Sequence, residues 1–160
     1  MPEPATLPVL DHLRELIAGG ADAAAPIHLR YPTAISEFLG FDIVSVGEGA
    51  ASVRVRTDPA RHGNQQGTVH GGFLVELADA AIGTAHSTLM QPGETFTSID
   101  IRAAFLRPVW ADTLTASAWC THRGRTITHY SCEVARADGK VAAAVTSTVM
   151  TLRGDAARGR

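Results

Sequence analysis

The sequence predicts an α+β domain in which a curved antiparallel sheet wraps around one long buried helix. Residues 72–90 place apolar side chains on nearly every side of a helix, and such a helix must be enclosed. At 1.5 Å per residue, its roughly 19 residues would span about 28 Å, which is long enough to be the axis of a small domain. Two strand-like stretches precede this helix and four follow it, and a sheet curled around the helix satisfies that order.

The N-terminal segment, residues 1–37, is predicted to consist of helix and loop. Leucine and isoleucine recur at helical spacing within residues 7–18, and Gly19-Gly20 then ends this short amphipathic helix. After an alanine-rich loop, Thr33 is expected to cap a second short helix that ends near Leu39-Gly40. We expect the segment to act as an amphipathic cover, with packing over a substrate pocket as the alternative.

Strands are expected on both sides of the central helix. Val53 and Val55 alternate with arginines, which predicts a strand with one solvent-facing side, and residues 98–101 also alternate. The Asp138-Gly139 pair is a strong hairpin signal between the last two strands. The expected strands are 41–46, 50–57, 95–106, 113–121, 126–135 and 141–152. They form a domain of residues 38–152, which is followed by a loose C-terminal tail at 153–160.

Two acids interrupt the apolar central helix. Glu76 and Asp79 are three residues apart and therefore point in similar directions. Because an ionised carboxylate is costly to bury, a chain that keeps one in such a helix usually gives it a partner or a task. On the helix alone, a structural aspartate bonded to a backbone amide is an equally good interpretation. The alanines of this helix, Ala78, Ala81 and Ala85, either leave room for a bound group or let strands pack closely.

The approach to this helix predicts a site for a negatively charged oxygen. Free amides at the start of a helix point outward and lie at the positive end of the helix dipole. The Gly71 amide could therefore hold a carbonyl oxygen that gains charge during a reaction, with the side-chain amide of Asn64 as a second donor. One donor of such an oxyanion hole can lower a reaction barrier by about 3 kcal/mol.

These motifs resemble those of a known enzyme family. The run N-x-x-G-x-V-H-G-G, which begins at Asn64, and the aspartate nine residues after His70 are similar to the hotdog-fold acyl-CoA thioesterases. The PaaI-like branch is the most similar. Residues 98–108 resemble the family's strand after the helix, and residues 122–125 resemble its later turn. The resemblance covers roughly residues 38–152.

The resemblance implies a fold, a reaction and an assembly. The fold is the hotdog fold, a curved antiparallel sheet around a central helix. The reaction is hydrolysis of an acyl-CoA thioester, and the active site lies at a homodimer interface, with a homotetramer as a further option. An open-edged sheet around one helix also tends to be completed by a partner, which gives the dimer independent physical support.

The resemblance also implies the catalytic residues. Asp79 is the catalytic carboxylate, acting as general base on a water or as nucleophile, and Glu76 is its rival on the same helix. Gly71 donates its amide to the thioester oxygen. Asn64 assists by polarising the carbonyl or by placing the water, although a turn residue is the plainer interpretation of an isolated asparagine.

The remaining matches are expected to position water and to bind substrate. Ser98 is expected to hold the attacking water beside the carboxylate, with Thr97 as the alternative. His70 and Gly72 are expected at the substrate-binding site, where the imidazole of His70 fixes the loop.

A basic turn is the candidate for binding the nucleotide end of CoA. Arg123, Gly124 and Arg125 lie between two predicted strands. The planar forks of arginine suit phosphate groups, so this turn could reach the CoA phosphates. A solvated surface turn is the alternative.

Composition narrows the remaining choices. A chain of 160 residues with 45% hydrophobic residues predicts one domain, and a net charge of -2 argues against nucleic acid as a partner. Cys120 and Cys132 lie in apolar runs without CxxC spacing, which favours reduced thiols. Charged residues interrupt the first twenty positions and no apolar run is long enough to span a membrane, so we expect a cytoplasmic protein. The histidines have no metal-ligand spacing, and this route to hydrolysis needs no metal or cofactor.

The predicted function is hydrolysis of a small or medium acyl-CoA or aryl-CoA thioester to the free acid and CoA. The alternatives are a non-catalytic module that binds or senses acyl-CoA, and a hotdog hydratase or dehydratase. The joint presence of Asn64, Gly71, Asp79 and Ser98 favours chemistry, because a pure binder does not need a carboxylate beside an oxyanion hole.

Overall fold

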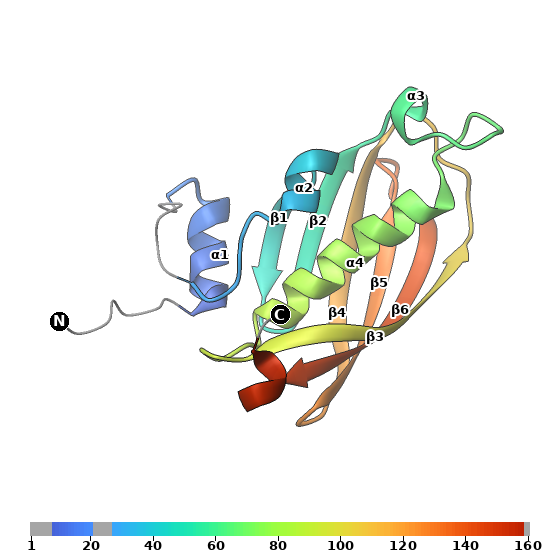
Figure 1. Ribbon diagram of the computed structural model, residues 1–160. Coiled ribbons are helices and arrows are strands. Elements are labelled where there is room, and N and C mark those ends of the chain that lie inside the picture. The colour runs from blue at the N-terminus through green and yellow to red at the C-terminus, as the bar shows by residue number, and fades with distance from the viewer. Residues whose placement is uncertain (1–7, 21–26, 159–160) are drawn as a thin grey trace.

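A computed structural model, which describes residues 8–20 and 27–158, has the predicted α+β architecture (Figure 1). A six-stranded antiparallel sheet in the order β1-β2-β4-β5-β6-β3 curves around the long helix α4. The helices are α1 (Val9–Ile17), α2 (Ala34–Leu39), α3 (Pro59–His62), α4 (Gly71–Ser87) and the 3-10 helix η1 (Gly154–Ala157). The strands are β1 (Asp42–Gly47), β2 (Ala50–Arg56), β3 (Thr95–Phe105), β4 (Thr113–Arg123), β5 (Ile127–Ala135) and β6 (Val141–Leu152).

Helix α4 is the centre of the core. Its sheet-facing residues are fully or almost fully buried: Leu74, Leu77, Ala78, Ala81, Ile82 and Ala85. Removing a side chain the size of Leu77 from water stabilises the fold by roughly 1.5–3 kcal/mol. The three alanines therefore allow the helix to pack closely on the strands, which was one of the two interpretations of their small size.

The N-terminal segment attaches to one edge of the sheet. Helix α1 packs beside the edge strand β1 and buries Val9, His12 and Leu13 (Figure 1). The predicted cap of α2 is confirmed, since Thr33 Oγ1 accepts a hydrogen bond from the backbone amide of Ser36 at 3.2 Å. Part of the expected loop and residue 7, the first of the expected helix, lie outside the described residues.

Two short helices were not predicted. The Asp58-Pro59 pair ends β2 as expected, but it also starts α3, because Asp58 Oδ1 accepts a hydrogen bond from the Ala60 amide at 2.9 Å. An N-cap aspartate followed by proline is a helix-start signal as well as a strand-end signal. In the predicted loose tail, η1 forms directly after Arg153, whose Nε donates to Glu94 at 2.6 Å.

Strand β3 changes face partway along its length. Ser98 faces α4, and Ile101 also packs against the core, although strict alternation would place these two residues on opposite faces. The register with β6 shifts between Ser98 and Asp100, so β3 carries a bulge at Ile99. The predicted regular alternation over residues 98–101 is therefore wrong. A bulge adds a single residue within a strand, and a four-residue pattern is too short to reveal the change of face.

Both cysteines have free thiols, with Cys132 buried in β5 and Cys120 half-buried in β4. Among the helices within residues 8–20 and 27–158, none is long and apolar enough to cross a membrane.

Candidate active site

The loop before α4 is shaped by Asn64. Its Oδ1 accepts hydrogen bonds from the backbone amides of Gln66 (2.9 Å) and Thr68 (3.2 Å), and its Nδ2 donates to Thr68 Oγ1 at 2.9 Å. This arrangement is an Asx-type turn, which agrees with the plainer interpretation of the asparagine. Because an amide nitrogen carries two hydrogens, Asn64 retains one donor for a ligand.

The first turn of α4 leaves one amide free to bind an oxygen. His70 is the N-cap, and its Nδ1 accepts a hydrogen bond from the Gly72 amide at 2.9 Å. The imidazole therefore fixes the loop, and the Gly72 amide is occupied. Among the described residues, nothing accepts a hydrogen bond from the Gly71 amide, which opens the helix at the positive end of its dipole.

Gly71 and Asn64 line the same pocket, which has a volume of about 420 Å³. Phe105, Leu106, Arg107 and Pro108 form the opposite wall of this pocket. A side chain at Gly71 would place its Cβ 2.9 Å from the ring of Phe105, a closer approach than carbon atoms tolerate. Because Phe105 is more than half exposed, its ring would have to move aside for any larger residue here, and glycine also keeps the amide accessible.

Asp79 and Ser98 form the second part of the site. Ser98 Oγ lies 3.4 Å from Asp79 Oδ1 and donates to it. Asp79 is half-buried. Burial raises the pKa of its carboxyl, and the hydrogen bond from Ser98 opposes that increase. The structure brings Ser98 to the carboxylate, whereas among the described residues Thr97 makes no side-chain hydrogen bond.

Glu76 lies one turn nearer the start of α4. Burial raises the pKa of its carboxyl, and the nearby charge of Asp79 raises it further. In the described part of the chain, no side chain donates a hydrogen bond to Glu76. Asp79, in contrast, has the hydroxyl donor of Ser98 beside it.

The basic turn lies at the other end of α4 from Gly71. Arg123, Gly124 and Arg125 line a small pocket of about 130 Å³ together with His86 and Arg153. Arg123 Nη1 lies 3.3 Å from Glu48 Oε1, and both side chains are largely exposed, so this ion pair contributes little and leaves the guanidinium available. The residues of this turn and those of the Gly71 pocket do not line a common pocket within one chain.

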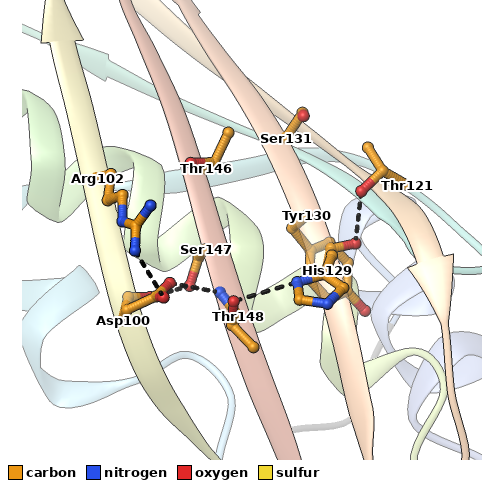
Figure 2. A pocket seen from close by; sticks show the side chains of 9 residues that line it. All are labelled: Asp100, Arg102, Thr121, His129, Tyr130, Ser131, Thr146, Ser147 and Thr148. Atoms are coloured by element: carbon orange, nitrogen blue, oxygen red, sulfur yellow. Dashed lines mark hydrogen bonds and ion pairs between the residues drawn. The ribbon is translucent and has the colours of Figure 1, made fainter.

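A further pocket of about 430 Å³ lies on the outer face of the sheet, the face that points away from α4 (Figure 2). Hydroxyl groups dominate its lining, and Asp100, Arg102 and His129 supply the ionisable side chains. It includes none of the predicted site residues. Within residues 8–20 and 27–158, no group of three or more His, Cys, Asp or Glu side chains is arranged to hold a metal ion.

Comparison with known proteins identifies the family. The model of the thioesterase superfamily matches residues 66–143, which include the Gly71 amide, Asp79 and Ser98. The acyl-coenzyme A thioesterase PaaI of Escherichia coli is 38% identical over 112 residues, which cover 69% of this chain and 76% of that protein. The chain belongs to the PaaI-like hotdog thioesterases. Its activity is thioester hydrolysis.

Other relatives agree with this family. The 1,4-dihydroxy-2-naphthoyl-CoA hydrolase of Listeria monocytogenes is 36% identical over 93 residues, covering 57% of this chain and 73% of that protein. The solved structure of the Escherichia coli PaaI protein has a TM-score of 0.71 and 33% identity, and covers 77% of this chain and 87% of that chain. A Haemophilus influenzae thioesterase structure has a TM-score of 0.73 at 25% identity, covering 96% of each chain. The predicted hotdog fold is confirmed. The Listeria relative is named a hydrolase and the Haemophilus structure a thioesterase.

Sequence reasoning missed two residues of this thioesterase that lie beside the site. The ring of Phe105 abuts Gly71, and no sequence signal marks that contact because the two residues are 34 positions apart in the chain. Asp100 is bonded at the bulge next to Ser98. The sequence signal for Asp100 is a charged residue between two isoleucines, Ile99 and Ile101.

Proposed function

We propose that this thioesterase hydrolyses a small or medium acyl-CoA or aryl-CoA thioester to the free acid and CoA. The observation that carries the proposal is the half-buried Asp79, with a serine hydroxyl 3.4 Å from its carboxylate, on the helix whose first amide is free. The CoA hydrolase names of two relatives support CoA as the thiol.

The spacing along α4 supports a site shared between two chains. Gly71 and Asp79 are eight residues apart on one helix, which corresponds to about 12 Å along its axis. A base and an oxyanion donor must both lie about 3 Å from the reacting group, so one chain cannot supply both to the same thioester. A two-fold axis beside the middle of α4 would lay the start of one helix next to Asp79 of the other.

The outer strand β3 supports the same homodimer. It is the last strand of the sheet, and it exposes Ile99 and Phe105. An open strand edge with exposed apolar side chains is a favourable surface for association with a second copy. The homotetramer stays a further prediction.

In the shared site, the thioester oxygen would bind the Gly71 amide of one chain, with Asn64 as a second donor. Ser98 of the other chain would hold a water, and Asp79 of that chain would accept a proton from it. The oxygen of this water then attacks the carbonyl carbon. The resulting oxyanion collapses, the carbon–sulfur bond breaks, and the CoA thiolate takes up the proton that Asp79 accepted, which restores the carboxylate. In the alternative route, Asp79 attacks directly, expels the thiolate and forms an anhydride that water hydrolyses.

The basic turn is proposed to bind the phosphates of CoA. Arg123 and Arg125 offer guanidinium forks at the end of the fold, and the turn requires Gly124, where a Cβ would lie 2.6 Å from the Ile127 carbonyl oxygen. His70 and Gly72 are proposed to hold the loop that lines the substrate. Two free thiols are in keeping with a reducing compartment, and we propose a cytoplasmic location.

The test is release of free thiol from short, medium, long and aromatic acyl-CoAs. We expect Asp79→Asn to lower kcat by about 100-fold or more while the protein remains folded, because the amide can neither accept the proton nor attack. Glu76→Gln is the matched control from the same helix, and it should stay within a few-fold of wild type. Near wild-type turnover in Asp79→Asn, or a larger loss in Glu76→Gln, would reject the assignment.

A further inference from the structure

We propose that Asp100 is a positioning residue of the active site, which holds the β3 bulge that turns Ser98 toward Asp79. The inference rests on the proposed function and deepens it. Asp100 itself lies on the outer face of the sheet and lines the pocket shown in Figure 2, so it does not touch the reacting atoms.

The bulge is necessary because two parts of β3 must face the same way. Ser98 faces α4 and reaches Asp79, while Ile101 and Ala103 pack against the core on that same face. A regular strand has a side-chain period of two, so it would turn either Ser98 or the core residues outward. The extra residue at Ile99 changes the parity of the strand and allows both to face the helix.

Two hydrogen bonds close the gap that the bulge leaves in the ladder between β3 and β6. Asp100 Oδ1 accepts the backbone N–H of Thr148 at 3.0 Å, and Ser147 Oγ donates to the backbone carbonyl of Asp100 at 2.7 Å (Figure 2). Backbone groups that lose their ladder partners at a bulge must find others, and Asp100 and Ser147 supply them.

The other contacts of the Asp100 carboxylate are weaker than its hydrogen bond to the Thr148 amide. Arg102 Nη2 lies 3.9 Å from Asp100 Oδ2, and its side chain is 81% exposed, so this ion pair contributes little. Thr148 is fixed on its other side, where its Oγ1 lies 3.1 Å from Nδ1 of His129 in β5. Thr148 of β6 is therefore hydrogen-bonded on both sides, to His129 of β5 and to Asp100 at the bulge.

The consequence concerns the contact between Ser98 and Asp79. Their oxygen atoms are 3.4 Å apart, at the outer limit of a hydrogen bond, so a small shift of the bulge would break the contact. Ser98 lies two residues from Asp100, on the opposite face of the strand. Loss of the hydrogen bond between Asp100 and Thr148 should therefore shift Ser98 and weaken its hydrogen bond to Asp79.

The experiment compares Asp100→Ala with Asp100→Asn, alone and in a Ser98→Ala background. Asparagine keeps an acceptor oxygen for the Thr148 amide but removes the charge, whereas alanine removes both. We measure kcat and kcat/KM against pH, and the titration of the Asp79 carboxyl by carbon-13 NMR. Glu133→Gln is the matched control, since Glu133 is an exposed acid on β5 that has no ion pair among the described residues.

If the proposal holds, Asp100→Ala lowers kcat by about tenfold or more, as misplacement of a catalytic group does, and moves the Asp79 titration to higher pH. Asp100→Asn and Glu133→Gln stay close to wild type, and Asp100→Ala adds little in the Ser98→Ala background. Simple removal of a negative charge would instead move the Asp79 titration to lower pH in both Asp100 variants.

An unshifted or lowered Asp79 titration in folded Asp100→Ala, or additive losses with Ser98→Ala, would overturn the proposal. If Asp100→Ala does not fold, Ser147→Ala removes the other bond and carries the same expectations. Failure of the proposed function has a different signature, namely no thiol release by wild type, and the NMR titration then still tests the position of Ser98.

Discussion

At the scale of single residues, the site depends on two opposing influences on Asp79. Burial raises the pKa of this carboxyl, which favours its neutral form. The hydrogen bond from Ser98 favours the ionised form. In the proposed mechanism only the ionised carboxylate accepts a proton or attacks a carbonyl, so the hydrogen bond from Ser98 favours the reactive form of this half-buried acid.

The corresponding prediction concerns the acid limb of the pH–rate profile. Because the pKa of Asp79 is raised, kcat/KM should fall as pH decreases through a value above the ordinary 3.8 of aspartate. Ser98→Ala removes the influence that lowers this pKa, so the acid limb should move to higher pH and kcat should fall. Steady-state rates between pH 4 and 8 check this. An acid limb that stays in place in Ser98→Ala would show that the hydroxyl does not act on the Asp79 carboxyl.

Candidate site residues were predictable from the sequence where chemistry and backbone geometry coincide. A glycine pair at a helix start and an acid inside an apolar helix identified Gly71 and Asp79 as candidates from the sequence. Phe105 could not be found in this way, since its importance comes from a ring packed against Gly71 across the pocket. Such a contact exists only after folding, and no local pattern encodes it.

At the scale of elements, the last turn of α4 is joined to the sheet through His86. Its Nδ1 lies 2.9 Å from the hydroxyl of Tyr130 in β5, and its Nε2 lies 3.0 Å from Thr151 Oγ1 in β6. The ring also makes an edge contact with Phe96 of β3. Burial, together with the charge of nearby Arg123, lowers the pKa of His86 to about 4.

This network predicts a pH-dependent stability. The pKa of His86 is about 4 in the folded state and 6.5 ordinarily, so the unfolded chain binds a proton first as pH falls. Stability from the neutral histidine is present above pH 6.5 and is lost between pH 6.5 and 4, by at most about 1.4 kcal/mol per pH unit. Urea unfolding at pH 7 and pH 5, at one fixed protein concentration, checks this.

His86→Gln should be less stable than wild type at pH 7 and should lose this part of the pH dependence. His122→Gln, at an exposed position on β4, is the control and should keep the wild-type slope. A slope unchanged by His86→Gln would mean that other groups carry the acid sensitivity.

Helices and strands were predicted from the sequence where a hydrophobic period extends over many residues. Short features that interrupt or lack such a period were missed. The central helix and all six strands follow from hydrophobic patterning, because burial imposes a period of 3.6 or 2 on the chain. The β3 bulge and the one-turn helix α3 span too few residues to establish a period. The bulge is nevertheless what turns Ser98 toward the site.

At the scale of the whole molecule, the division of the site is the main feature. Asp79 lies in the middle of α4 with Ser98 of β3 beside it, and Gly71 and Asn64 lie at the helix start. About 12 Å of α4 separates Gly71 from Asp79. Sequence patterning could predict an open-edged sheet, but it does not encode how two chains meet, because that depends on the shape of a folded surface.

Mixing two inactive variants tests this division directly. Asp79→Asn and Gly71→Val should each be inactive alone. If Asp79 works with Gly71 of the partner chain, a mixed dimer keeps one intact site. Equal amounts, unfolded and refolded together, give half mixed dimers, so about a quarter of wild-type activity should return in the mixture and about half in the isolated mixed dimers. Thiol release is measured after mixed dimers are isolated by two affinity tags.

The reciprocal control uses a chain with both substitutions, refolded with wild type. Under the shared arrangement, each site of this mixed dimer lacks one group, so the dimer should be inactive, although one of its chains is fully wild type. A site contained in a single chain predicts the opposite in both mixtures: no recovery from the two single variants, and half activity from wild type paired with the double variant. The two mixtures therefore separate a shared site from a self-contained one even if the substitutions alter stability, because each set of dimers carries the same number of lesions.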